Sequence, residues 1–405
     1  MTAHVAPSAA FANLAPNIGG ESVGTLPPGR FMVSAMYMFG SVASRYGDDG
    51  TGGAISDSLN RNISWQMVID EEKERREQIA GLLSSSGVDS KDSAGNMVGK
   101  FDGTMQVTVP VLGCGITKKL GLFAAMPIIK LKANAAIAFQ ASESSKALMQ
   151  NLQNMGQASV AKEFALSLNN GFEDKLKRAG YKFENHTERQ MIGDLRLELP
   201  YVFDTEGRSF KDALTTTIVV PTAQLAPMDD VYQVSGGLKR WGVGVRNAYQ
   251  FSFIKRAAVT LTGGVLAYLP VTQAKRIPQD AADQLPEEID EFTRISTALS
   301  YQASAFVSYQ MSRSWAAKAG MQHQEILNHG YSGDRYNANR YGVLTEKSGM
   351  RLDSASAQVE FSAVQGFLDG DFFMPGVITA GIGYPLLGRS SLSDATYMIQ
   401  GIFFF

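Results

Sequence analysis

The charged residues with the most suggestive spacing lie in the stretch GDLRLELPYVF, residues 193–203. Asp194, Arg196 and Glu198 alternate with leucines, so their side chains project from one face of a β-strand. Arg246 lies in a similar alternating stretch, and the four residues together resemble an acid–base cluster. Opposite charges on neighbouring strands also pair simply to neutralise one another. The regular alternation favours this second interpretation, in which the charges line the inside of a barrel.

Other reactive residue types give no catalytic or metal-binding pattern. Cys114 is the single cysteine, so the chain forms no internal disulfide and no cysteine-based zinc site. The four histidines are far apart and make no ligand motif: His4, His186, His323 and His329. The acidic turn GDDGTGG, residues 47–53, lacks the spacing of a calcium loop. The sequence therefore predicts no enzyme, no cofactor and no bound metal.

Composition narrows the class of protein. The formal net charge is -2 over 405 residues, so no strong field attracts nucleic acid. Forty glycines and 10% aromatic residues suit β structure with many turns. No apolar run approaches the roughly 20 residues of a membrane-spanning helix. A membrane remains open to this chain, because barrels cross it with short alternating strands.

Alternation of apolar and polar residues recurs along the chain and predicts β-strands. It is clearest in RFMVSAMYMFG (30–40), GTMQVTVPVLG (103–113), RWGVGVRNAYQFSF (240–253) and ISTALSYQASAFVSYQM (295–311). We count about 12 strands, each near the roughly 9–11 residues of a tilted membrane-crossing strand. The predicted fold is all-β: a transmembrane, antiparallel up-and-down β-barrel of about 12 strands (about 12–14), with helical extracellular loops.

The more apolar face of each strand is expected to meet lipid, and the opposite face the lumen. Expected lipid-facing residues include Val33, Tyr37, Phe39, Met105, Val107, Val109, Val111, Phe123, Ala125, Ile129 and Leu131. The apolar lumen candidates are Met32, Met36, Met38, Met126, Ile128, Phe306, Met398 and Ile402. The polar ones are Lys130, Lys132, Arg196, Glu198, Arg246, Gln250, Lys318, Gln322 and Glu360. Methionines form adaptable apolar surfaces, although they also simply fill a narrow barrel.

Loop lengths predict the topology. Odd-numbered connections are long, with insertions at about 43–100 and 140–190, whereas even-numbered ones are short. This sorting is typical of outer-membrane barrels with both termini in the periplasm. Residues 30–405 are expected to form the barrel. Residues 1–29 precede the barrel and are expected to be a signal-peptide remnant or a polar leader. Within this region and up to Arg30, residues 13–30 are expected to form a short plug or a periplasmic segment.

Two long loops carry helical patterns. Residues 63–83 place Val68, Ile79, Leu82 and Leu83 along one side, and residues 141–178 space Leu148, Leu152, Met155, Val160, Phe164, Leu168 and Phe172 by three and four. One interpretation is an amphipathic lid that captures a greasy ligand. The other is a pair of loop helices that pack on each other over the barrel mouth.

Prolines interrupt two predicted strands beside the second long loop. Pro127 and Pro200 each remove one hydrogen-bond donor from the ladder. In lipid an unsatisfied partner is expensive. A simple bulge is the commoner explanation, and a side opening for hydrophobic cargo is the alternative.

The chain closes on DATYMIQGIFFF, residues 394–405, which alternates to its end. We expect this strand to pair with the first one and so close the sheet. The stretch resembles the terminal signal of bacterial outer-membrane proteins through Tyr397, Ile399, Phe403 and Phe405, with Gly401 as a weaker match. That resemblance implies recognition by the barrel-assembly machinery.

Residues 193–270 resemble a known family through GDLRLELPYVF, TTTIVVPTAQ, GVGVRNAYQFSF and VTLTGGVLAYLP. They look like the outer-membrane proteins assigned to the meta-pathway of phenol degradation, which are similar to the long-chain fatty-acid and aromatic-hydrocarbon transporter barrels. Met191 and Ala223 stand where that family has glycines, and no Asn-Pro-Ala motif or long N-terminal hatch is present. The resemblance implies a barrel but no specific fatty-acid mechanism.

The predicted function is a channel in the bacterial outer membrane for passive uptake of small hydrophobic or aromatic compounds. Arg196 and Arg246 would orient a carboxylate or hydroxyl of the cargo. The alternatives are a structural or adhesive barrel with a sealed lumen and partner-binding loops, or a general diffusion porin. Expected partners are outer-membrane lipid and lipopolysaccharide, the barrel-assembly machinery and a small hydrophobic ligand, without nucleic acid. We expect a monomer.

Overall fold

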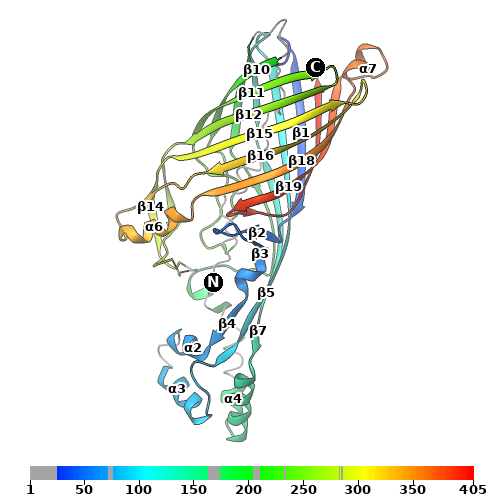
Figure 1. Ribbon diagram of the computed structural model, residues 1–405. Coiled ribbons are helices and arrows are strands. Elements are labelled where there is room, and N and C mark those ends of the chain that lie inside the picture. Colours follow the sequence, from blue (N-terminus) through cyan, green and yellow to red (C-terminus); the bar gives the residue numbers. More distant parts are fainter. Residues whose placement is uncertain are drawn as a thin grey trace.

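A computed structural model describes residues 25–71, 76–162, 173–174, 176–203, 210–231, 234–281, 283 and 286–405. Its main body is a closed antiparallel barrel of 12 strands, as the sequence predicted. Figure 1 shows the strands wrapping around one axis, with the C-terminus at one end and the long loops at the other. The leader and most of the plug expected before the barrel, residues 1–24, lie outside the described residues.

The barrel strands follow one another around the wall. They are β1 (Phe31–Ser41), β5 (Ser93–Gly115), β6 (Gly121–Ala125) with β7 (Ile128–Ala141), β8 (His186–Ile192) with β9 (Leu195–Val202), β10 (Phe210–Val220), β11 (Gly242–Ile254), β12 (Ala257–Tyr268), β15 (Ala298–Gln310), β16 (Trp315–Ile326), β18 (Met350–Ser362), β19 (Gly376–Arg389) and β21 (Thr396–Phe404). The register pairs Met32 with Phe404 and Gly40 with Thr396, so the last strand closes the sheet against the first as expected. The sheet therefore leaves no edge between its two ends.

Two barrel strands are each interrupted and so consist of two elements, β6 with β7 and β8 with β9. Pro127 separates β6 from β7, yet their pairing with β5 keeps one register, from Val111↔Ala125 to Thr108↔Ile128. The next strand gains one residue at Gly193–Asp194, because Ile128 pairs with Ile192 whereas Ala125 pairs with Arg196. This one-residue offset is a β-bulge. Pro200, by contrast, lies within the regular strand β9, opposite Thr215.

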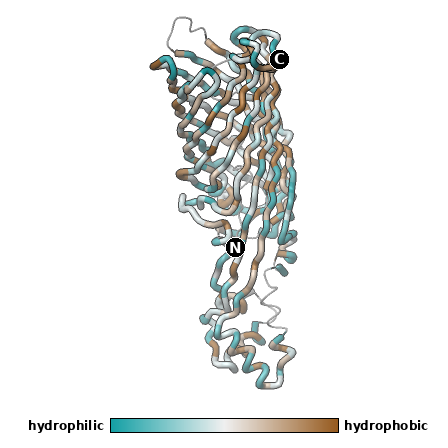
Figure 2. Tube along the Cα trace, turned by 90° about the vertical axis from the view of Figure 1, so that its right-hand side faces the viewer, coloured by the Kyte–Doolittle hydropathy of each residue, from teal (hydrophilic) through white to brown (hydrophobic). Residues whose placement is uncertain are grey.

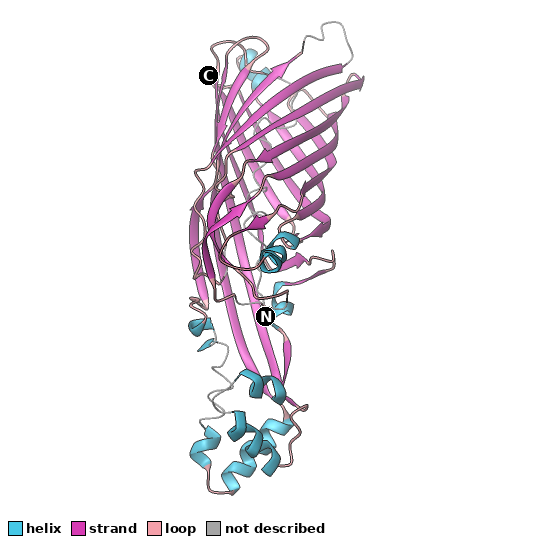
Figure 3. Ribbon diagram, turned by 90° about the vertical axis from the view of Figure 1, so that its left-hand side faces the viewer, coloured by secondary structure: helices cyan, strands magenta, loops and turns pink. Residues whose placement is uncertain are grey.

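The second and third strands extend far beyond the barrel as a hairpin. Its end carries β4 (Arg61–Ser64) and the helices α2 (Trp65–Glu71), α3 (Arg76–Ser85) and α4 (Glu143–Asn154). The 3-10 helix η1 (Ile55–Leu59) lies nearer the barrel, where Ile55 donates a backbone hydrogen bond to Ala43. Figure 3 shows α2, α3 and α4 gathered at the tip, away from the barrel mouth. The helical patterns expected at 63–83 and 141–178 thus give short helices, and Phe164, Leu168 and Phe172 lie outside the described residues.

Smaller elements cover the loop end. A three-stranded sheet of β13 (Val271–Arg276), β14 (Ile289–Ile295) and β17 (Tyr331–Ser332) lies beside α6 (Ala338–Glu346), and a second one joins β2 (Ser44–Tyr46), β3 (Gly52–Ala54) and β20 (Ser391–Leu392). At the opposite end, the connection from β18 to β19 contains the short helix α7 (Val364–Leu368).

The outer surface of the barrel is apolar. Exposed side chains include Val33, Tyr37, Phe39, Val243, Val245, Tyr249, Phe251, Leu261, Tyr301, Val307, Tyr309, Val359, Ile378, Tyr397 and Ile399. Figure 2 shows hydrophobic and polar residues alternating along these strands. Among the described residues, no helix is both long and apolar enough to cross a membrane.

Candidate functional site

One side of the barrel interior is apolar. The register places Met32, Met36 and Met38 of β1 on the same face as Gly113, Val109 and Val107 of β5. We call this surface the apolar wall; its members are Met32, Met36, Met38, Met105, Val107, Val109, Val111, Phe123, Ala125, Ile129, Leu131, Met398 and Ile402. Met36 is 5% exposed and Val109 is 1% exposed, so these side chains are packed rather than bathed in water.

Segments from outside the strands complete this packing. Leu26, Val42, Ile55 and Val234 are buried in the same cluster, and Phe183 lies against it. Leu26 belongs to the short stretch before β1, where Gly29 donates a hydrogen bond to the Gly115 carbonyl at 3.0 Å. The apolar wall is therefore covered in part by residues that reach into the barrel from loops and from the chain before β1.

The predicted faces of the second and third strands were inverted. Met105, Val107, Val109, Val111, Phe123, Ala125, Ile129 and Leu131 point inward, and Met126, Ile128, Lys130 and Lys132 share the outer face with Pro110, Thr108, Gln106 and Thr104. Lys130 and Lys132 form ion pairs with Glu188 at 2.7 and 3.2 Å on that outer face. Met126 and Ile128 are thus not lumen residues. The inner face of these strands is the more apolar one, so hydrophobicity alone selected the wrong side.

The opposite side of the interior is polar. Arg246 of β11 and Glu198 of β9 form an ion pair at 3.2 Å whose side chains are only 6% and 4% exposed. Lys318 and Glu360 form a second pair at 2.9 Å, with about a quarter of each side chain exposed. We call this surface the polar wall; its members are Arg196, Glu198, Thr215, Arg246, Gln250, Thr260, Thr262, Ser304, Lys318, Gln322 and Glu360.

Glu198 and Arg246 pair inside the barrel, but β10 lies between their two strands, so the predicted pairing of charges on neighbouring strands is not what joins them. Arg196 shares their face, and Gln250 lies two positions beyond Ala248 on β11. The hydroxyls of Thr215, Thr262 and Ser304 were missed as lumen residues, although their alternation with apolar residues signals an inward polar face. Thr262 and Ser304 are joined by a 2.6 Å hydrogen bond between their hydroxyls.

Phe306 is a large aromatic side chain within the polar half. It is 4% exposed, and its ring lies over Gly320 of the next strand, where an added Cβ would approach it to 2.5 Å. A side chain at position 320 would displace the ring. Phe306 therefore lies in the lumen, as predicted, and glycine at position 320 makes room for it.

Asp194 at the bulge anchors a loop. Its carboxylate accepts backbone hydrogen bonds from Ala223 (3.0 Å), Leu238 (3.0 Å) and Lys239 (3.1 Å). Gly193 donates to the Pro127 carbonyl at 2.7 Å, so the proline's neighbourhood remains hydrogen-bonded. The bulge predicted at Pro127 or Pro200 is present at neither proline, and the one-residue bulge lies instead at Gly193–Asp194. Asp194 is a structural anchor rather than a member of a charge cluster.

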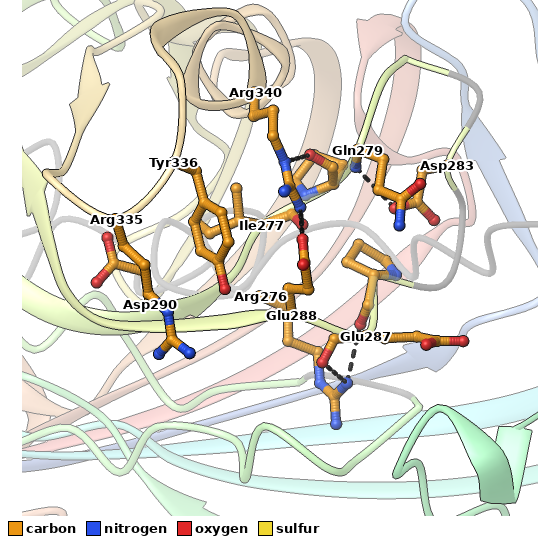
Figure 4. A network of polar contacts seen from close by, with 12 residues as sticks. Arg276, Ile277, Gln279, Asp283, Glu287, Glu288, Asp290, Arg335, Tyr336 and Arg340 are labelled. Carbon is orange, nitrogen blue, oxygen red and sulfur yellow. Dashed lines mark hydrogen bonds and ion pairs between the residues drawn. The ribbon is translucent and has the colours of Figure 1, made fainter.

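Arginines hold the loops together at the mouth. Arg276 donates to the carbonyls of Met228, Ala179, Pro286 and Gly180, and its guanidinium lies 3.9 Å from the Tyr181 ring centroid. Figure 4 shows Arg340 reaching the Ile277 carbonyl and Glu288 from α6. Because each guanidinium offers several donors, one side chain satisfies several loop carbonyls. No sequence pattern signals this network, since its acceptors are backbone atoms of distant loops.

A cationic region lies where these loops meet the polar wall. Arg240 donates to the carbonyls of Tyr268, Leu269 and Ser296. Burial and the nearby Arg240 lower the pKa of Lys275. Burial, aided by the charge of Arg240, lowers the pKa of His329 to about 4, so this imidazole is neutral at pH 7. Arg240 is therefore the fixed positive charge of this part of the mouth, and its presence disfavours the charged forms of Lys275 and His329.

The loop helices pack on each other. Trp65, Ile69, Ile79, Leu83, Ala94, Leu148, Leu152 and Ala161 form a core of their own at the hairpin tip. The tip lies beyond the barrel mouth rather than across it (Figure 3). Mutual packing, one of the two predicted interpretations, is what the described residues show. Their packing uses the apolar face that a ligand-capturing lid would need.

The last strand keeps the alternation expected of an assembly signal. Tyr397 and Ile399 are exposed on the outer face, while Met398 and Ile402 lie against the apolar wall. Phe403 pairs with Val33, and Phe405 exchanges backbone hydrogen bonds with Phe31 at 3.0 and 2.9 Å. Within the described ranges, no three His, Cys, Asp or Glu side chains come together as a metal site.

Comparison with known proteins places the fold. No family model and no curated sequence matches the chain. The COG4313 outer-membrane channel from Pseudomonas putida F1 superposes with a TM-score of 0.53 at 12% identity, over 95% of this chain and 98% of that one. The chain has the fold of a bacterial outer-membrane barrel. The predicted fold class is confirmed at this level.

Two further channels align more loosely. The CymD monoaromatic hydrocarbon channel aligns at a TM-score of 0.31 with 9% identity, over 94% of this chain and 88% of that one. The Pseudomonas putida toluene transporter TodX aligns at 0.30 with 9% identity, over 93% and 88%. All three structures are described as channels or transporters, and the fold is inferred from the COG4313 channel alone.

Proposed function

We propose that the protein is a non-enzymatic channel for passive uptake of small hydrophobic or aromatic compounds. The observation that carries this proposal is the apolar wall, a methionine-rich surface that faces the interior although the membrane faces the other side of the same strands. A water-filled diffusion pore has a mostly polar interior instead. Flexible thioether side chains suit contact with varied apolar molecules.

The polar wall would orient the cargo. Arg196 on this wall and Arg240 at the mouth would favour a molecule that carries a carboxylate or hydroxyl. Arg246 is engaged by Glu198, so its charge is already compensated. A compound with one apolar and one polar side would therefore lie between the two walls.

Uptake and conductance test the proposal. Met36→Ser places a hydroxyl in the apolar wall, and Met126→Ser, on the outer face of a nearby strand, is the matched control. Cells that depend on a hydrophobic carboxylate should take it up several-fold more slowly with Met36→Ser and normally with Met126→Ser. Equal uptake by both variants, in barrels shown to be folded by heat-modifiable migration, would contradict the proposal.

A sealed structural barrel is the second candidate. It is favoured by the burial of the apolar wall under Leu26, Ile55, Val234 and Phe183. In planar bilayers a sealed barrel stays silent with and without a hydrophobic carboxylate, whereas a channel for such compounds changes its conductance when the carboxylate is added. Large steady currents without ligand would favour a general diffusion porin.

We further propose that both termini face the periplasm and that the hairpin tip faces outward. The sorting of short turns and long loops to opposite ends of the barrel supports this orientation. An epitope inserted after Asn154, at the end of α4, should be detected on intact cells. Detection only after the outer membrane is opened would reverse the orientation.

We also propose that the barrel-assembly machinery inserts the protein, that it contacts lipopolysaccharide, and that it is a monomer. The outward aromatic residues Tyr397, Phe403 and Phe405 support recognition of the last strand. Deleting Phe405 should lower the amount of folded barrel in the membrane, and unchanged folded protein would argue against this signal.

A further inference from the structure

The connection between β18 and β19 exposes apolar side chains outside the barrel wall. We call residues 363–375 the foot; it lies at the same end of the barrel as the C-terminus (Figure 1). Leu368 is 71% exposed and Phe373 is 91% exposed, and Phe367 and Phe372 are exposed as well. Large apolar side chains exposed together on one turn mark a contact surface.

The foot is a folded turn. Phe367 donates to the Ala363 carbonyl at 2.9 Å, and Asp371 donates to the Gly366 carbonyl at 2.7 Å. The Phe372 ring lies against Gly366, where an added Cβ would approach it to 2.3 Å. The apolar side chains are therefore held in place while they remain exposed.

An aromatic row joins the foot to the lipid-facing surface. The Phe372 ring meets Phe361 edge-on at 5.9 Å, and Phe361 lies 5.1 Å from Trp315. Trp315 and Val359, two residues before Phe361 on β18, are exposed on the outer face of the barrel. The foot thus folds outward and continues the aromatic band that barrels place at the edge of the membrane.

Neighbouring turns at this end have a different composition. Residues 311–314 (MSRS) and 254–256 (IKR) carry one or two cationic side chains and no acidic one, as do residues 116–120 (ITKKL). Basic residues suit the anionic head groups of phospholipid. Arg313 lies in the turn next to the foot, because β16 pairs with β18. The surroundings of the foot therefore match a membrane surface.

We propose that the foot is a membrane-interface anchor that inserts Leu368 and Phe373 among the head groups and upper acyl carbons of the adjacent lipid leaflet. Asp369 and Asp371, both exposed, stay on the aqueous side. Side chains with a large apolar area bind at this depth because burying them there is favourable. The proposal rests on the barrel fold and is independent of the proposed transport.

Spin-label depth measurements test the anchor. In a Cys114→Ser background, a nitroxide is attached at Phe373→Cys, and the full-length barrel is placed in bilayers of phosphatidylethanolamine and phosphatidylglycerol. The label should be relaxed more by oxygen than by a water-soluble nickel chelate. The control label at Ser312→Cys, in the polar turn next to the foot, should show the opposite ratio.

A second variant removes the contact that aims the foot. Adding Phe372→Ala to the labelled protein should raise the accessibility of position 373 to the nickel chelate several-fold, because the link to Phe361 is lost. Equal nickel accessibility at positions 373 and 312 would overturn the proposal. So would protection of position 373 in native outer-membrane vesicles but not in pure lipid, which would assign the foot to a protein partner.

Discussion

The apolar wall and the polar wall of the barrel interior both bury large side chains, but different interactions stabilise them. On the apolar wall, Met36 and Val109 are stabilised by close packing against neighbouring strands and inserted loop residues. On the polar wall, Arg246 and Glu198 are nearly as well buried, but each is stabilised by an opposite charge. Packing depends on volume, whereas a buried ion pair depends on the presence of both partners. The two walls should therefore respond differently to substitution.

The difference also separates two possible uses of the interior. An apolar surface makes non-directional contact with varied hydrocarbons, whereas fixed charges select the polar group of a molecule. The side chains of Lys318 and Glu360 are more exposed than those of Arg246 and Glu198. The polar wall therefore contains one buried ion pair and one partly hydrated ion pair. Substitutions on each wall sharpen this comparison.

The largest effect is expected from Glu198→Ala. Arg246, which is 6% exposed, would lose its charged partner inside the barrel, and breaking a buried pair in this way costs about 3–5 kcal/mol. Denaturant unfolding of the refolded barrel, followed by heat-modifiable migration, measures the loss. Replacing both residues by well-packed apolar ones should recover much of it. A single variant as stable as the wild type would show that water, rather than Glu198, compensates Arg246.

Met36→Ala probes the apolar wall. Removing a packed side chain that is 5% exposed should cost about 3 kcal/mol through lost burial and the cavity left behind. Met321→Ala removes the same side chain from the outer face, where it is 61% exposed, and should cost less than about 1 kcal/mol. The same unfolding assay compares the two. Equal losses would mean that the apolar wall is loosely packed and open.

The mouth above the polar wall should weaken in acid because of His329. Burial and the charges of Arg240 and Lys275 lower its pKa to about 4 from 6.5. The unfolded chain therefore binds a proton more readily, and stability contributed by neutral His329 is lost as the pH falls from about 6.5 towards 4. Because of this proton linkage, the free energy of unfolding should fall by about 2 kcal/mol between neutral pH and pH 5.

Hydrogen exchange across residues 327–350 measures this acid effect. Protection of these amides should fall between pH 7 and pH 5 after correction for the intrinsic exchange rate, and His329→Asn should remove most of the pH dependence. If the wild type and the variant lose protection in parallel, protonation of His329 is not what weakens the mouth in acid.

The sequence predicted the barrel, its closure and most of one wall. Alternation defines two faces, and the aromatic residues Tyr37 and Phe39 identified the outer face of β1 correctly. In β5 the inner residues are the more apolar, so Val107 and Val109 were assigned to lipid and the true face was missed. Hydrophobicity distinguishes inside from outside only where the interior is polar.

Other parts of the site were beyond the reach of local pattern. The bulge at Gly193–Asp194 depends on the pairing of two strands, so only the register reveals it. Arg240, Arg276 and Arg340 bind loop carbonyls, and a sequence shows neither the loops' paths nor their free acceptors. The charges at Glu198 and Arg246 were predictable, because opposite charges on inward faces must find each other.

The smallest effect is expected from Glu360→Ala on the partly hydrated pair. The side chains of Lys318 and Glu360 are 29% and 25% exposed, so water replaces much of the lost interaction and the cost should stay below about 1 kcal/mol. Raising the salt concentration should reduce the difference further, since exposed charges are screened. Glu198→Ala should keep its larger, salt-insensitive loss in the same unfolding assay. Equal costs for the two glutamates would mean that the interior near Lys318 is as dry as the interior near Arg246, and the polar wall would then be uniformly closed to water.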